Sequence, residues 1–157
     1  MIRAMAARDK APVLGLIRAT GFFTDAEIGV AEELLDIYLD RPGQRDYDVV
    51  VVENDAKAVA GYMTWGPTPL AEGAYDLYWM AVAPSEQGKG RGKELVRWLE
   101  AEVGKLNGRV ILIETSSQPK YRGTRQFYID LGYKEVARVP DFYRAGDDRV
   151  IYAKYFR

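Results

Sequence analysis

A glycine-rich, basic turn is the part of the sequence whose residue types point most directly to chemistry. It reads Gln87-Gly88-Lys89-Gly90-Arg91-Gly92-Lys93 and lies where an expected strand ends and an expected helix begins. Glycines there permit positive φ and a close approach of the backbone to a ligand, while the free N–H groups at the start of the helix attract negative oxygens. The turn therefore predicts a diphosphate-binding site, and the alternative is a plain turn with a solvated basic surface.

The spacing of the glycines narrows the kind of nucleotide. A dinucleotide-binding fingerprint that starts at Gly88 needs a third glycine at position 93, where the chain has Lys93. A Walker loop needs Lys and then Ser or Thr directly after its second glycine, and neither glycine register provides them. The pattern therefore disfavours nicotinamide dinucleotides and ATP.

The composition excludes several kinds of chemistry. The 157 residues contain no Cys and no His, which removes Cys–His and Ser-His-Asp hydrolases and most transition-metal enzymes, so no metal site is expected. Lys and Arg number 22 against 23 Asp and Glu, and nucleic acid is therefore not an expected partner. The chain has no signal-peptide-like start and no apolar run of about 20 residues, so a cytoplasmic protein without a membrane partner is expected.

Hydrophobic periodicity and capping residues predict the elements that position the turn. No repeat or linker divides the chain, so one domain over residues 1–157 is expected. The order of strands and helices predicts an α/β or α+β fold with a mixed sheet. The expected elements are a strand over Ile2–Ala6, helices from Asp9 to Gly21 and from Thr24 to Pro42, strands at Val49–Val52, Ala58–Trp65 and Tyr75–Ala83, a helix from the turn to Gly108, a strand at Val110–Ile113, a helix over Tyr121–Leu131, and strands over Tyr133–Val139 and Arg149–Phe156.

Two motifs in this order make the sequence resemble the GCN5-related N-acetyltransferase (GNAT) superfamily. Gln87, Gly90 and Gly92 match the family's Gln-x-x-Gly-x-Gly loop, which binds the pyrophosphate of acetyl-coenzyme A. Farther along, Phe127–Tyr133 matches the family pattern Phe/Leu-Tyr-x-x-x-Gly-Phe/Tyr. The hairpin before these motifs and the two strands after them also fit, so the resemblance covers essentially the whole chain from Ile2 to Phe156.

The resemblance implies a fold and an activity. The fold is a mixed, mostly antiparallel central sheet with a splayed parallel strand pair, flanked by about four helices. The activity is transfer of an acetyl group from acetyl-CoA, the donor cosubstrate, to a primary amine by direct attack in a ternary complex without a metal. The acceptor would be a small-molecule amine or a peptide N-terminus.

The resemblance also assigns roles to residues. Backbone groups of Met80 and Val82 would hold the pantetheine arm, and the turn would hold the diphosphate. Tyr128 matches the tyrosine near the coenzyme sulfur and would act as general acid or stabilise the thiolate. Glu114 matches a glutamate that serves as base through water, and its place after the apolar run Val110–Ile113 predicts a partly desolvated carboxylate with a raised pKa. The alternative is a salt-bridged or capping glutamate. The residues expected to bind the cofactor are Met80, Val82, Gln87, Gly88, Lys89, Gly90, Arg91, Gly92 and Lys93.

One position departs from the family pattern. An Asn that bonds the pantetheine usually precedes the tyrosine, and this chain has Tyr121 at that place. Ser116, Ser117 or Gln118 could substitute for it. The basic residues Lys120, Arg122 and Arg125 could reach the 3′-phosphate of the coenzyme or form a solvated surface.

The acceptor and the assembly state leave alternatives open. The rival functions are a non-catalytic acyl-CoA-binding module, a transferase of the same fold that uses a longer acyl group, and a scaffold without a nucleotide. A homodimer is also open, because Trp65, Trp79 and the strand Tyr152–Phe156 could form a dimer surface as easily as a core. The candidates to line the acceptor pocket are Glu32, Glu33, Tyr78, Asp141 and Tyr143, the last two in a loop expected over residues 141–148.

Overall fold

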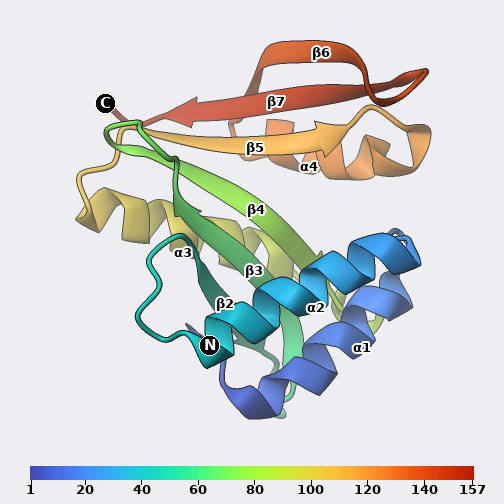
Figure 1. Ribbon diagram of the computed structural model, residues 1–157, viewed down its shortest axis with the longest axis vertical. Helices are drawn as coiled ribbons and strands as arrows, with labels where there is room; N and C mark the ends of the chain where they lie inside the picture. Colours follow the sequence, from blue (N-terminus) through green and yellow to red (C-terminus); the bar gives the residue numbers. More distant parts are fainter. The chain divides into compact units, whose positions relative to one another are not determined.

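The computed structural model describes residues 1–157 and confirms the expected fold class: seven strands in a mixed sheet with one parallel pair, and four α-helices (Figure 1). The helices are α1 (Lys10–Thr20), α2 (Asp25–Asp40), α3 (Arg91–Lys105) and α4 (Arg122–Asp130). The strands are β1 (Ile2–Ala4), β2 (Asp48–Glu53), β3 (Val59–Pro67), β4 (Ala74–Val82), β5 (Val110–Ser116), β6 (Lys134–Arg144) and β7 (Asp147–Tyr155).

The strands are hydrogen bonded in the order β1-β2-β3-β4-β5-β7-β6. The pairing of β4 with β5 is parallel, and helix α3 connects these two strands. This parallel pairing joins Ala74–Leu77 to Val110–Ile113 and ends there, although β4 continues to Val82 and β5 to Ser116. Only the first part of each strand therefore belongs to the parallel ladder.

Contacts divide the chain into two compact units. The first contains Met1–Gly66 and Trp79–Leu99, and the second contains Pro67–Tyr78 and Glu100–Arg157. The glycine-rich turn lies in the first unit, whereas Glu114 and Tyr128 lie in the second. The expectation of one domain over the whole chain stays a prediction.

Capping residues define the ends of the two helices that precede β2. Thr24 Oγ1 accepts a hydrogen bond from the Glu27 N–H (3.2 Å), and the Glu27 carboxylate accepts one from the Thr24 N–H (3.0 Å), which is a capping box at the start of α2. Gly21 ends α1 with φ +71°, a left-handed conformation that glycine adopts at little cost. Both ends agree with the sequence prediction.

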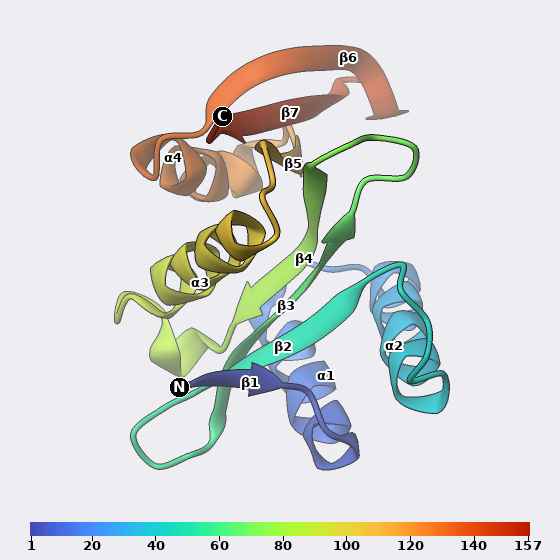
Figure 2. The same cartoon turned by 90° about the vertical axis from the view of Figure 1, so that its left-hand side faces the viewer.

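The core of the first unit explains why its strands are so apolar. Figure 2 shows α1 and α2 on one side of β2 and β3 and α3 on the other. Val49 and Val51 pack with α1 and α2 in one buried cluster. On β3, Trp65 meets Trp98 of α3 edge to face, with ring centroids 6.0 Å apart. Side chains on both faces of these strands are buried, and Trp65, for which core and dimer surface were both open, belongs to the core.

Asp9 lies at the expected start of α1, where its side chain was expected to cap the helix, but its carboxylate binds other groups. Its side chain makes no capping hydrogen bond to α1 and is bound instead by both terminal nitrogens of Arg3, at 2.7 and 3.0 Å, and by the Ala6 N–H at 2.8 Å. Arg3 Nε also donates to Glu53 at 2.7 Å. Asp9 is 3% exposed, and the Arg3 hydrogen bond is the main reason that the pKa of its carboxyl is lowered. The three residues join β1, β2 and the start of α1.

The second unit contains the sheet β5-β7-β6 with α4 beneath β5 and β7 (Figure 1). Strands β5 and β7 pair without interruption from Val110 opposite Tyr155 to Ser116 opposite Arg149. The expected loop over residues 141–148 is wrong, because β6 runs to Arg144, β7 begins at Asp147, and only Ala145 and Gly146 form the turn. A register shift between Val139 and Arg144 takes up the extra residues of β6.

Removal of Arg3 tests the buried ion pairs of the first unit. Arg3→Ala leaves the buried Asp9 and Glu53 carboxylates without their cation, so the free energy of unfolding should fall by about 3 kcal/mol. Lys105→Ala, which breaks an exposed pair with Glu102, should change it by at most about 0.5 kcal/mol. Urea denaturation of the three proteins measures both values, and equal losses in the two variants would contradict the role given to Arg3.

Candidate active site

The glycine-rich turn connects the end of β4 to the start of α3. Gly88 and Gly90 have φ +76° and +83°, and a Cβ atom at either would meet nothing within 4 Å. The Gly90 carbonyl accepts the first helical hydrogen bond, from the Glu94 N–H (2.9 Å), so the N–H groups of residues 91–93 precede the helix's own bonding. The turn is exposed, and it offers backbone donors without side chains in front of the two glycines.

Gln87 fastens the turn to the strand before it. Its Nε2 atom donates to the Val82 carbonyl oxygen at 3.2 Å. Met80 and Val82, whose backbone was expected to hold a pantetheine arm, are half-buried in the last three residues of β4. The glutamine therefore has a clear structural role in fixing where the turn leaves the strand.

Glu86 holds the positive side chains of the turn. Its carboxylate accepts a hydrogen bond from Asn54 Nδ2 (3.1 Å) and lies 3.5 Å from Arg91 Nε and 3.7 Å from Lys89 Nζ. The Asn54 hydrogen bond, with help from Lys89 and Arg91, lowers the pKa of the Glu86 carboxyl, which stays ionised. Two of the three expected cations thus already have an anion beside them, so the backbone donors and Lys93 remain the main attraction for a phosphate.

Tyr128 lies inside the second unit. It is 4% exposed, and its ring packs edge to face with Phe127 (centroids 5.2 Å apart) and Tyr133 (6.2 Å). Burial raises the pKa of the Tyr128 phenol well above its ordinary value. The hydroxyl is therefore protonated throughout the physiological range, and it can donate a hydrogen bond or a proton but cannot serve as a base.

The expectation that Glu114 is desolvated is wrong. Its side chain is 44% exposed, because residues of β5 alternate between two faces and Glu114 lies on the open one. Its Oε1 atom accepts a hydrogen bond from Arg149 Nη2 on the neighbouring strand β7. Glu114 is thus a half-exposed carboxylate in an ion pair with Arg149.

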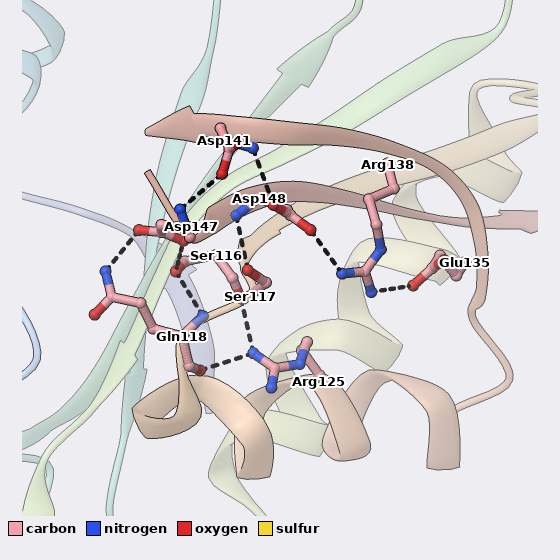
Figure 3. A network of polar contacts seen from close by, with 10 residues as sticks. Ser116, Ser117, Gln118, Arg125, Glu135, Arg138, Asp141, Asp147 and Asp148 are labelled. Atoms are coloured by element: carbon pink, nitrogen blue, oxygen red, sulfur yellow. Dashed lines mark hydrogen bonds and ion pairs between the residues drawn. The ribbon is translucent and has the colours of Figure 1, made fainter. Parts of the chain in front are cut away.

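The segment that follows β5 is locked by a polar network (Figure 3). Ser116 Oγ donates to Asp147 Oδ1 (2.5 Å), and Gln118 Nε2 donates to Asp147 Oδ2 (2.6 Å). Ser117 Oγ accepts from the Asp148 N–H at 2.7 Å. All three side chains that could have replaced the family's pantetheine-binding Asn are therefore engaged with the β6–β7 hairpin.

Asp147 and Arg125 complete this network. Asp147 is 3% exposed, and although burial favours its neutral form, the hydrogen bonds from Ser116 and Gln118 hold the pKa of its carboxyl below the ordinary value. Arg125 of α4 donates through Nη1 to the carbonyl oxygens of Ser116 (2.8 Å) and Gln118 (2.9 Å). For Arg125, a coenzyme phosphate and a solvated surface were both open, and here its guanidinium ties α4 to the end of β5.

The expected acceptor residues fall in both units. In the first, Glu32 pairs with Lys10 at 3.4 Å, and Glu33 is exposed on α2. In the second, Tyr78 and Tyr143 are each more than 40% exposed, and Asp141 has φ +51° with its carboxylate accepting from the Gly146 N–H (2.7 Å). Asp141 thus shapes the hairpin turn.

Two residues near Glu114 escaped the sequence analysis. Arg149 pairs with Glu114, and its guanidinium carbon lies 5.1 Å from the ring centroid of Phe142 on β6. The only sequence pattern that could have found them is strand register, since Glu114 and Arg149 are diagonal neighbours on adjacent strands. That register becomes visible only when the strands are paired.

Two further properties of the chain bear on the site. The structure brings together no group of three or more Asp or Glu side chains that could hold a metal ion. None of the helices has the length and apolar character that crossing a membrane requires.

Alkaline unfolding tests the burial of Tyr128. A folded-state pKa raised above the unfolded value of about 10 means that the native phenol keeps its proton where the unfolded one loses it, so stability is full below that pH and falls above it. Tyr128→Phe should reduce this fall by up to about 1.4 kcal/mol per pH unit. Denaturant titrations at several pH values above 9 measure the slope, and Tyr155→Phe, at an exposed position, should leave it unchanged. An unchanged slope in Tyr128→Phe would contradict the buried, neutral phenol.

Comparisons with known proteins agree with this geometry. Residues 45–135 match the model of the acetyltransferase (GNAT) domain. A solved structure from Desulfovibrio desulfuricans that is classed in the GNAT family is 41% identical, covers 99% of this chain and 98% of its own, and superposes with a TM-score of 0.92. An aminoglycoside 6′-N-acetyltransferase complexed with coenzyme A shares the fold, with 20% identity, coverage of 99% and 96%, and a TM-score of 0.74.

A curated relative gives a shorter match. The S-(2-succino)cysteine N-acetyltransferase of Bacillus subtilis is 28% identical over 92 residues. The match covers 57% of this chain and spans only 56% of the length of that relative. The family model spans the turn, β5 and Tyr128, and together with the structure from Desulfovibrio desulfuricans it shows that this chain belongs to the GNAT acetyltransferase family.

Proposed function

We propose that the protein is an N-acetyltransferase, a single catalytic domain over residues 1–157 that moves an acetyl group from acetyl-CoA to a primary amine in a ternary complex. The observation that carries the proposal is the turn between β4 and α3, where Gly88 and Gly90 have positive φ and precede N–H groups that have no partner within the helix. Membership of the GNAT family supports this use of the turn. Coenzyme A in the related aminoglycoside acetyltransferase and the cysteine-derived acceptor of the Bacillus subtilis relative support the donor and acceptor classes.

The residues present fit the diphosphate of the coenzyme. The space in front of Gly88 and Gly90 is open, and any side chain there would occupy it. N–H groups of residues 91–93 and the positive end of the α3 dipole favour bound anionic oxygens. Gln87 fixes the turn against Val82, so these donors are oriented before the ligand arrives. When bound, acetyl-CoA supplies the acetyl group as a reactive thioester.

Glu114 is the proposed base. An attacking amine must lose protons to become neutral and to complete the transfer, and a carboxylate can accept them directly or through water. Glu114 is ion-paired and half-exposed, so its carboxylate is reachable from solvent.

Tyr128 is the proposed acid. The thiolate that leaves needs a proton or a strong hydrogen-bond donor, and the buried neutral phenol provides one at all physiological pH values. Because its pKa is raised well above that of a thiol, hydrogen-bond stabilisation of the thiolate is favoured over complete proton transfer.

The two proposed groups lie on opposite faces of the second unit's sheet. Lys154 of β7 contacts Tyr133 and the Leu131 carbonyl beside α4, and it shares its face of β7 with Val150 and Tyr152. Glu114 pairs with Ile151, whose side chain points to the other face. This arrangement suits direct transfer, since the amine approaches the thioester from one side and the thiolate leaves on the other.

The turn can be tested with a pair of matched variants. Gly90→Val should abolish stabilisation by acetyl-CoA, because the side chain strains the positive φ and fills the space proposed for a phosphate. Gly146→Val is the control, since Gly146 has φ +80° and equally open space but lies in the β6–β7 turn. A ligand at 100 times its dissociation constant adds about 2.7 kcal/mol of stability, which raises the melting temperature of a domain of this size by about 5–10 °C.

Thermal unfolding with acetyl-CoA, CoA, longer acyl-CoAs, NAD and ATP provides the measurement. The wild type and Gly146→Val should shift with acetyl-CoA and not with NAD or ATP. A shift that survives in Gly90→Val would remove the turn from the coenzyme site, and a larger shift with a longer acyl-CoA would change the donor.

The role of Tyr128 is tested by turnover. Tyr128→Phe should lower kcat by about 10²–10⁴-fold, the usual effect of losing a positioned acid, while the acetyl-CoA shift in melting temperature is retained. Tyr155→Phe is the control at an exposed site and should keep wild-type turnover. Unchanged kcat in Tyr128→Phe would exclude the phenol from the reaction, and absence of turnover in the wild type with intact coenzyme binding would favour a non-catalytic acyl-CoA-binding module.

A further inference from the structure

The open face of the second unit's sheet carries the ion pair between Glu114 and Arg149. Strand β5 pairs with β7 so that Glu114 lies opposite Ile151 and Ser116 opposite Arg149. Residues that lie opposite each other point to the same side of the sheet, and so do alternate residues of one strand, so these four share the face away from α4. Their neighbours on this face include Leu112 of β5 and Val139, which lies opposite Arg149 on β6. Val139 is 40% exposed. The same register places Lys134 on this face, opposite Ala153, and also Asp147, whose carboxylate is bound by Ser116.

Arg149 is held in a defined orientation. Its Nη2 atom donates to Glu114, and its guanidinium lies over the ring of Phe142 at 5.1 Å. Phe142 is itself fixed by an edge-to-face contact with Tyr143, with centroids 5.0 Å apart. A guanidinium stacked on an aromatic ring keeps its plane while its edge nitrogens remain available for hydrogen bonds.

Arg149 also has hydrogen-bonding capacity that the chain does not use. A guanidinium carries five N–H donors, and Glu114 engages only Nη2. The Nε atom is shielded from water and has no hydrogen-bond partner. Because Nε is shielded, an arriving carboxylate would engage the two terminal nitrogens, which can form charge-assisted hydrogen bonds with its two oxygens.

We propose that the acceptor is an α-amino acid, free or substituted on its side chain, whose carboxylate binds Arg149 and whose ammonium binds Glu114. This inference rests on the proposed function and names the substrate class of that site. In an α-amino acid the ammonium and the carboxylate are both attached to the α-carbon. The carboxylate can therefore pair with the arginine while the ammonium pairs with the glutamate. A polyamine has no group for Arg149, and a peptide N-terminus lacks the neighbouring carboxylate.

The exchange also explains how an ion-paired Glu114 becomes a base. The arriving carboxylate replaces Glu114 on the guanidinium, and the freed carboxylate then faces the ammonium of the same molecule. Glu114 accepts one proton from this ammonium, which leaves a neutral amine with a lone pair for the thioester carbonyl. Arg149 is thus a specificity-determining residue that binds the acceptor and releases the base.

Paired substrates test the proposal. We would measure acetyl-CoA consumption with the common L-amino acids, each as the free acid and as its carboxamide, which keeps the amine and side chain but removes the carboxylate charge. For the preferred side chains the wild type should show kcat/KM about 10- to 100-fold higher for the acid, the range expected for a charge-assisted bidentate contact. Arg149→Met should abolish this preference by raising KM for the acid toward the value for the amide.

Two further variants separate recognition from folding. Arg149→Lys keeps the positive charge but loses the parallel N–H donors of the guanidinium. It should therefore retain part of the preference for the acid that Arg149→Met loses. Arg144→Met removes an arginine from the same hairpin, where it lies 3.8 Å from Asp147, and should leave the preference at the wild-type value. Equal melting temperatures of Arg149→Met and Arg144→Met would exclude an effect through unfolding.

The outcomes distinguish this inference from the function on which it rests. Equal rates on acids and amides, or an acid preference that persists in Arg149→Met, would overturn the role of Arg149. Turnover with spermidine or an alanyl peptide but with no amino acid would overturn the amino-acid class and leave the acetyltransferase intact. No turnover with any amine would overturn both.

Discussion

The buried carboxylate of Asp147 is the constraint on which the candidate catalytic residues of the second unit depend. A buried charge is tolerated only when hydrogen bonds satisfy it, and here Ser116 and Gln118 do so at 2.5 and 2.6 Å. These contacts fix the end of β5, which follows Glu114, to the start of β7, which carries Arg149. Arg125 then joins α4, and with it Tyr128, to the same segment through two carbonyl oxygens. One satisfied charge thus aligns three elements (Figure 3).

The glycine-rich turn of the first unit is suited to attract an anion without a strongly basic surface. Glu86 neutralises much of the charge of Lys89 and Arg91, which would otherwise repel each other beside the turn. What remains is a set of backbone dipoles at the start of α3, whose orientation is fixed by the helix and by the Gln87 hydrogen bond to Val82. Oriented dipoles need no reorganisation when a phosphate arrives, whereas flexible cations lose side-chain entropy.

Local patterns in the sequence predicted most of the fold, and long-range pairing explains the failures. The Thr24 cap, the Gly21 stop and the strand–turn–helix around Gly88 depend on neighbouring residues, and the structure agrees with them. The burial of Glu114 depends on which face of β5 a helix covers, and the apolar run before it carries no information about that. Likewise, the Asp147 partner of Ser116 and Gln118 lies about thirty residues away on β7, so the sequence could not reveal that these side chains bind the β6–β7 hairpin.

Successive side chains of β5 point to opposite faces of the sheet, and this separates the proposed base from the proposed acid. Ile113 and Thr115 point toward the side of α4, and Glu114 between them points away from it. A proton acceptor for the amine and a proton donor for the thiolate can therefore be supplied from opposite sides of one strand, with neither group close enough to quench the other. A carboxylate beside the phenol would instead trap its proton in a hydrogen bond. Arg149 also holds the proposed base, Glu114, in an ion pair. In the proposed exchange Glu114 is released only when the carboxylate of an acceptor replaces it on Arg149.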